Sequence, residues 1–245
     1  MVRRLVPALA AAVLALGALS GCATSVPPAE SPSEDPGGAA GTVPEGSADV
    51  EVDAAWLAGG SIIAIVTYGS STPDCAPRLD DAVLDAGVLV VTLAEQSENV
   101  CDGDLVPRGL LVGTPDGVEP AEGLDVQVVW NDRYTDVELA PYTAGPVDEY
   151  QPSAGWAGDE HIAILTWGSS SCAPSVESTT VVSPTEIAVT FASPPADQVC
   201  TMDMAPRVAI ATVDGEVSRE ATLSLGGLTL GDPGERDPGA SIPIG

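Results

Sequence analysis

The chain has 245 residues, of which 36 are Asp or Glu, eight are Arg, one is His and none is Lys, and its formal net charge is -28. The absence of lysine excludes Schiff-base, Ser-Lys and P-loop chemistry. With one histidine there is no multi-His zinc site, and any Ser-His or Cys-His mechanism has to use His161. Such an acidic chain also lacks the basic patch that nucleic acid requires, so we expect no nucleic-acid partner.

Residues 1–21 have the pattern of a secretory signal, with two arginines before an apolar run from about Leu5 to Leu19. The run ends in Leu-Ser-Gly-Cys, which resembles the lipobox of bacterial lipoproteins. That resemblance implies cleavage before Cys22, acylation of its thiol and stable attachment to the outer face of the cell membrane. The alternatives are an ordinary secretory signal and an uncleaved anchor, but the run is shorter than the ~20 residues of a spanning helix.

Residues 22–48 contain five prolines among Ser, Gly and Glu, and almost no large apolar side chain. A segment of this composition cannot bury enough surface to fold. We therefore predict a disordered, partly extended tether that holds the folded part away from the bilayer.

A tandem repeat is the main internal feature of the sequence. Residues 63–71 read IAIVTYGSS and residues 162–170 read IAILTWGSS, and Cys-Ala-Pro follows in both places. Downstream, four residues recur 99 positions later, which pairs Cys101, Asp104, Pro107 and Arg108 with Cys200, Asp203, Pro206 and Arg207. The repeat predicts one domain over 49–146, a second over 147–232 and a flexible C-terminal tail over 233–245.

Both copies contain short β-branched runs bounded by Gly, Pro, Asp and Ser, and no segment after the signal has a sustained helical period. The predicted strands are residues 62–68, 88–94, 109–112 and 124–130 in the first copy, and 161–167, 186–192, 208–213 and 221–225 in the second. We therefore predict an all-β fold of two tandem, small antiparallel β-sandwiches. An immunoglobulin-like topology is one candidate, on size and strand count alone.

Four cysteines remain after Cys22, two at equivalent places in each copy, and they allow three pairings. Duplication favours the pairing that is repeated within each copy, Cys75 with Cys101 and Cys172 with Cys200. Disulfides persist in an exported chain. A redox or metal-binding thiol pair is disfavoured because the sequence has neither a CxxC spacing nor a partner histidine.

Two acid-base pairs occur in both copies, Asp104 with Arg108 and Asp203 with Arg207. We interpret them as structural ion pairs that fix the disulfide loop to the next strand. The functional alternative is a ligand carboxylate held by the arginine.

No catalytic, metal or cofactor site is predicted. The Gly-Ser-Ser-Ser run at 168–171 does not match GxSxG, and Ile62 stands in the first copy where the second has His161. The acids near Asp102 lack the spacing of a calcium loop, and Thr201 replaces that residue in the second copy. If a recognition surface exists, we expect it among the aromatic side chains at the strand ends and between the copies, namely Tyr68, Trp130, Tyr134 and Trp167.

The repeated pattern GSSSCAP followed by C..D..PR is similar to a unit of actinobacterial lipoproteins, and this resemblance implies a location rather than an activity. We expect a lipid-anchored, extracytoplasmic binding or structural module of the cell envelope, without catalysis and without a cofactor. Its partner would be an envelope protein or a neutral or cationic ligand, since the surface is anionic. The alternatives are a carboxylate-based, calcium-assisted hydrolase and an accessory subunit of a membrane protein complex.

Overall fold

The computed structural model describes residues 51–94, 100–131, 133–228 and 241–245. The signal, Cys22 and the tether lie outside the described residues. Within them, no helix has the length and apolarity needed to cross a membrane.

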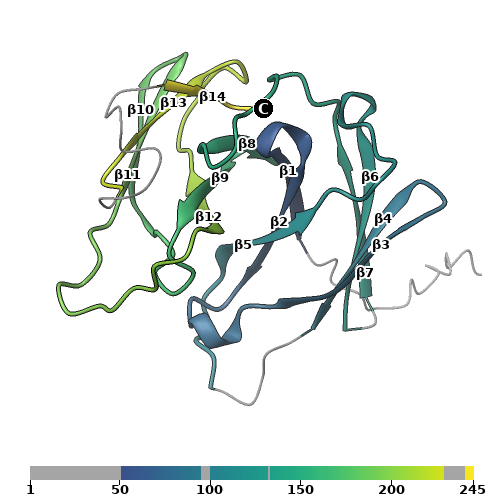
Figure 1. Cartoon of the computed structure of the whole chain (residues 1–245), viewed down its shortest axis with the longest axis horizontal. Coiled ribbons are helices and arrows are strands. Elements are labelled where there is room, and N and C mark those ends of the chain that lie inside the picture. Colours follow the sequence, from purple (N-terminus) through teal and green to yellow (C-terminus); the bar gives the residue numbers. More distant parts are fainter. Residues whose placement is uncertain (1–50, 95–99, 132, 229–240) are drawn as a thin grey trace, which may run out of the picture. The chain divides into compact units, whose positions relative to one another are not determined.

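The first copy folds into two facing sheets (Figure 1). The inner sheet has the order β1-β2-β5 and consists of β1 (Val52–Leu57), β2 (Ile62–Gly69) and β5 (Val106–Gly113). The outer sheet has the order β3-β4-β6-β7 and consists of β3 (Arg78–Asp85), β4 (Val88–Ala94), β6 (Leu124–Trp130) and β7 (Arg133–Leu139). Three short 3-10 turns connect strands: η1 (Ala58–Gly60), η2 (Pro73–Cys75) and η3 (Pro120–Glu122).

The second copy repeats this arrangement strand for strand. Its inner sheet has the order β12-β9-β8, with β8 (Ser153–Ala157), β9 (His161–Gly168) and β12 (Ala205–Thr212). Its outer sheet has the order β10-β11-β13-β14, with β10 (Val176–Ser183), β11 (Glu186–Phe191), β13 (Thr222–Gly226) and β14 (Ser241–Pro243). The predicted all-β fold of two sandwiches is confirmed.

Two details of the prediction are wrong. The sandwiches are not purely antiparallel, because β4 pairs in parallel with β6 and β11 in parallel with β13. The fourth strand of each copy thereby joins the sheet of the third, sixth and seventh strands, which differs from the immunoglobulin constant-domain order. The flexible tail predicted over 233–245 is also wrong at its end, because Ser241–Pro243 pairs with β13 as the seventh strand of the second copy.

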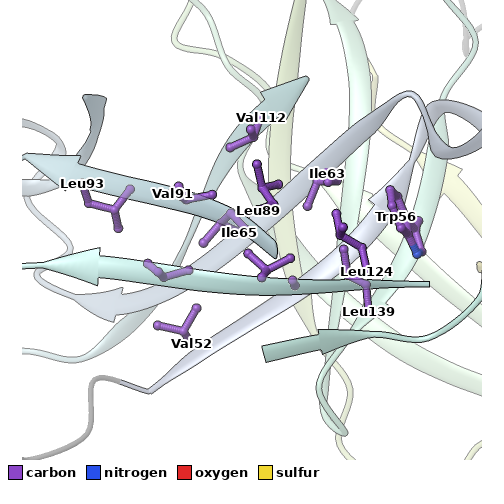
Figure 2. Packing of buried hydrophobic residues seen from close by; sticks show 13 residues of the cluster. Val52, Trp56, Ile63, Ile65, Leu89, Val91, Leu93, Val112, Leu124 and Leu139 are labelled. Carbon is purple, nitrogen blue, oxygen red and sulfur yellow. The ribbon is translucent and has the colours of Figure 1, made fainter. Parts of the chain in front are cut away.

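The core of the first sandwich lies between its two sheets (Figure 2). Alternate residues of the outer strand β4, Leu89, Val91 and Leu93, point inward and are buried, while the residues between them are half-buried. This period of two is typical of a strand with one face in the core. Opposite them lie Ile63 and Ile65 of the inner sheet. The second sandwich has an equivalent core that includes Ile162 and Ile164.

A third core joins the two inner sheets to each other. It contains seven buried side chains: Ala55, Leu57, Ala64, Val66, Ala157, Ala163 and Leu165. Strands β2 and β9 are therefore buried on both faces, and this explains their continuous apolar runs. The four sheets form consecutive layers: outer, inner, inner, outer.

The contact between the inner sheets is reciprocal. The Ala58 backbone N–H donates to Ser153 Oγ at 2.8 Å, and at the equivalent place Gly158 lies against the Asp53 carboxylate. Since residues 53 and 58 correspond to 153 and 158, each copy offers the same two positions to the other. Contacts of this kind define a two-fold interface between homodimer subunits. The two copies are therefore related like the subunits of a dimer, joined in one chain.

Candidate functional site

Both predicted disulfides are confirmed. Cys75 is bonded to Cys101 and Cys172 to Cys200, each within its own copy. Each disulfide joins the turn after the second strand of a copy to the loop before its fifth strand. The turn is shorter in the second copy, where three residues separate Gly168 from Cys172, than in the first, where five separate Gly69 from Cys75.

The acid and the arginine of each predicted pair bind the same turn. In the first copy Asp104 Oδ1 accepts the Ser71 backbone N–H at 2.8 Å, while Arg108 Nε donates to the Ser70 carbonyl at 2.8 Å. No ion pair of 4 Å or less is described between the acid and the arginine of one copy, and the two side chains hold the N–H and carbonyl groups of the same turn. The hydrogen bond from Ser71 holds the pKa of Asp104 below its usual value.

The second copy uses the same acid but places the arginine deeper. Asp203 Oδ1 accepts the Ser170 backbone N–H at 3.0 Å, and hydrogen bonds from Ser170 and Thr201 lower the pKa of Asp203. Arg207 donates to the carbonyls of Trp167 and Cys172, both at 3.1 Å, and is only 6% exposed. The Trp167 carbonyl belongs to the end of β9 and the Cys172 carbonyl to the turn that follows it, so Arg207 links the two.

The four aromatic residues singled out from the sequence lie in different layers. Tyr68 and Trp167 pack against the core between the inner sheets, and the Trp167 ring meets that of Tyr150 edge to face at 5.2 Å. Trp130 and Tyr134 belong to the β6–β7 hairpin of the outer sheet, where Trp130 packs partly into the core and Tyr134 is exposed. The structure therefore does not gather them at one surface.

Tyr68 of the first copy forms a hydrogen bond with His161, the single histidine of the chain, which lies in the second copy. Its hydroxyl donates to Asp53 Oδ2 at 2.8 Å and lies 3.0 Å from Nδ1 of His161. Because the phenol has one proton, Nδ1 of His161 is the donor in the second hydrogen bond. Burial and the bond to Asp53 raise the pKa of Tyr68, so the phenol stays neutral. This cluster fastens the inner sheets together.

A pocket of about 510 Å³ opens at one end of the second sandwich. It lies where β9, β11, β12 and β13 begin or end, between the inner and outer sheets. We call it the methionine pocket, and the side chains that define it are Phe191, Met202, Met204, Arg207 and Leu228, together with the Cys172–Cys200 disulfide. Phe191 and Leu228 belong to the core of the sandwich, so the pocket reaches into the core.

The pocket collects the rarest apolar residues of the chain. Phe191 is the only phenylalanine, and Met202 and Met204 are the only methionines after Met1. Met202 is fully exposed and Met204 half exposed, although both are apolar. The corresponding residues of the first copy are Gly103 and Leu105, so this feature belongs to the second copy.

The lining of the pocket combines apolar side chains with a few polar groups. Its two cysteines are oxidised, and its lining contains no histidine. Nowhere in the described part of the chain do three or more His, Cys, Asp or Glu side chains gather as they would around a metal ion. Apolar walls with a few fixed polar groups are the usual composition of small-molecule sites.

The sequence predicted the frame of this pocket but not the pocket. Both cysteines, Asp203 and Arg207 were expected to be structural, and Phe191, Met202 and Met204 were not singled out. A signal was present in the comparison of the copies, because Met202 and Met204 are among the places where residues 200–207 differ from residues 101–108. Both copies retain this loop, and the residues at which the two loops differ were the available indication of a site in the second copy.

Comparison with models of protein families, with curated proteins and with solved structures finds no match to this chain. Its class rests on its own strands and disulfides: an all-β protein of two duplicated, disulfide-bonded sandwiches with a pocket in one of them.

Proposed function

We propose that the protein is a lipid-anchored, extracytoplasmic binding module whose ligand occupies the methionine pocket. The pocket is the single observation that favours binding over a purely structural role. Its volume of about 510 Å³ falls in the range of roughly 300–1,000 Å³ that small-molecule sites span. The wall of core side chains behind it offers a site that is formed before the ligand arrives.

The anchor is proposed from the N-terminal sequence. The signal pattern, the lipobox ending in Cys22 and the proline-rich tether form the order expected of a lipoprotein. Two disulfides suit an oxidising compartment outside the cytoplasm. Two or more acyl chains on one cysteine would hold the module stably on the membrane, and the tether would let the pocket reach ligands beyond the lipid headgroups.

One expression experiment tests both parts of the proposal. The full chain is produced in a bacterium that processes lipoproteins, in medium with an alkyne-labelled fatty acid. We expect label on the protein and recovery in the membrane fraction, both lost in Cys22→Ser. An unlabelled wild-type chain that is secreted into the medium would contradict the anchor.

The same preparations report on binding. Small molecules released from the purified protein on denaturation are identified by mass spectrometry. We compare wild type with Ala192→Trp, which fills the pocket, and with Ala94→Trp at the equivalent position of the first copy. A molecule present in wild type and Ala94→Trp but absent from Ala192→Trp is the expected result, and equal recovery from all three would contradict the pocket as the site.

A further inference from the structure

We propose that the ligand of the methionine pocket is an uncharged, mainly apolar small molecule. This inference rests on the proposed binding function and narrows it. The sequence alone left a neutral or a cationic ligand open, and the charges and side chains of the pocket distinguish between them.

The walls of the pocket select an apolar body. Phe191 and Leu228 come from the core of the sandwich, and Pro174, Pro194 and Pro195 add further apolar surface. Polar side chains are a minority that includes Ser169 and Gln198. A molecule that covers these walls removes apolar surface from water, which is the main source of affinity in such sites.

The outside of the pocket disfavours an anion. The chain carries a formal net charge of -28, and the Asp203 carboxylate is part of the lining. Hydrogen bonds from Ser170 and Thr201 stabilise that carboxylate in its ionised form. A negatively charged ligand therefore approaches against the field of the whole molecule and against a fixed negative charge at the site.

The inside of the pocket disfavours a cation. Arg207 lines it and is 6% exposed, and a guanidinium keeps its charge at every physiological pH. Its described hydrogen bonds to the Trp167 and Cys172 carbonyls hold it in place as part of the wall. Together with the Asp203 carboxylate, Arg207 gives the described lining one negative and one positive charge, so the pocket offers no net countercharge to a ligand ion. A charged ligand would lose its hydration against apolar walls without a net countercharge in return, so a neutral ligand is favoured.

Met202 and Met204 form part of the rim of the methionine pocket. Met202 and Met204 extend from the loop before β12, exposed at the rim of a site with apolar walls. An unbranched thioether side chain adapts its shape to irregular apolar surfaces. Exposed apolar side chains at the rim gain burial when they contact an apolar ligand, and they can adapt to ligands of differing shape.

Matched dyes test the charge rule. All described contacts lie within residues 51–245, so a chain without residues 1–22 retains them and is titrated in detergent-free buffer. N-phenyl-1-naphthylamine is compared with its sulfonated relative 8-anilino-1-naphthalenesulfonate, and Nile red with its cationic relative Nile blue. We expect both neutral dyes to bind, and each charged relative to bind at least roughly tenfold more weakly.

Variants locate the binding. Met202→Gln combined with Met204→Gln should weaken the neutral dyes, whereas Leu105→Gln at the equivalent position of the first copy should not. A sulfonate or cation that binds as tightly as its neutral relative, and still responds to the methionine variants, overturns the neutral-ligand rule and leaves the pocket as a binding site. No binding of any dye, or equal loss in Leu105→Gln, overturns the proposed function together with the inference.

Discussion

Gly155 lies where the backbones of the two inner sheets meet. A Cβ at this position would stand 2.4 Å from the Trp56 carbonyl oxygen and 3.1 Å from the Cβ of Ala55. Residue 55 is the repeat counterpart of residue 155, so near this point the duplicated chain meets its own equivalent. Only one of the two positions has room for a methyl group, and the chain has alanine in one and glycine in the other.

Substitution of Gly155 by alanine should therefore destabilise the whole unit. The obstructing atom belongs to the backbone, so a change of rotamer cannot relieve the clash, and we expect a loss of about 1–3 kcal/mol in the free energy of unfolding. Guanidinium unfolding measures it. The control is Gly113→Ala at the end of β5, where the new methyl group meets nothing within 4 Å; equal losses in the two variants would refute the close approach.

At the scale of elements, the two disulfides should contribute similarly to stability, but only one of them lines the methionine pocket. The bonded cysteines are 26 and 28 residues apart in the sequence. The chain-entropy model therefore predicts that each disulfide stabilises the fold by about 3.5 kcal/mol. Only Cys172 and Cys200 line the methionine pocket. Removing either disulfide should lower stability, and removing the second should also lower affinity.

The test replaces both cysteines of one disulfide by alanine at a time. Each double variant should melt about 10 °C below wild type by calorimetry. Nile red affinity should fall roughly tenfold for Cys172→Ala with Cys200→Ala, and should stay at the wild-type value for Cys75→Ala with Cys101→Ala. Equal affinity losses would mean that the second disulfide acts on the pocket only through global stability.

Elements also divide into those that the sequence predicts and those that it does not. Strands β2 and β9 are buried on both faces, and their apolar runs identify them directly. The edge strands β3 and β10 keep mostly exposed or half-buried residues such as Asp80 and Thr179, so apolar patterning does not reveal them. Strand β14 has three residues, and residues 227–240 separate it from β13. Its place follows only once the seventh strand of the first copy is known.

The residues of the candidate site also divide into those that the sequence predicts and those that it does not. The cysteines and the Asp203 and Arg207 pair are visible in sequence because the repeat preserves them. The pocket depends on the burial of Arg207 and on the position of Phe191 at the end of β11, and both are consequences of three-dimensional packing. Repetition identifies what holds the fold, while a site carried by one copy appears in the differences between the copies.

At the scale of the whole molecule, the two sandwiches share a hydrophobic core between their inner sheets and are therefore not independent domains. The core between the inner sheets contains fully buried side chains from both copies, including Ala64, Val66, Ala163 and Leu165. A hydrogen bond between Tyr68 and His161 also joins the two copies. An interface that resembles a domain core is typical of obligate dimers, so the covalent link between the copies should be dispensable once the chain has folded.

A protease site inserted at the exposed pair Asp148 and Glu149 tests this dependence without asking either half to fold alone. After cleavage of the native protein, we expect the two fragments to remain together at the mass of the intact chain in size-exclusion chromatography with light scattering. They should separate only at denaturant concentrations that unfold the sandwiches, because separation exposes the shared core to water. Fragments that part as folded monomers in native buffer would show that the interface contributes little. Cleaved Tyr68→Phe protein should separate at a lower denaturant concentration than cleaved wild type, since it lacks the hydrogen bonds that join β2 to Asp53 and His161.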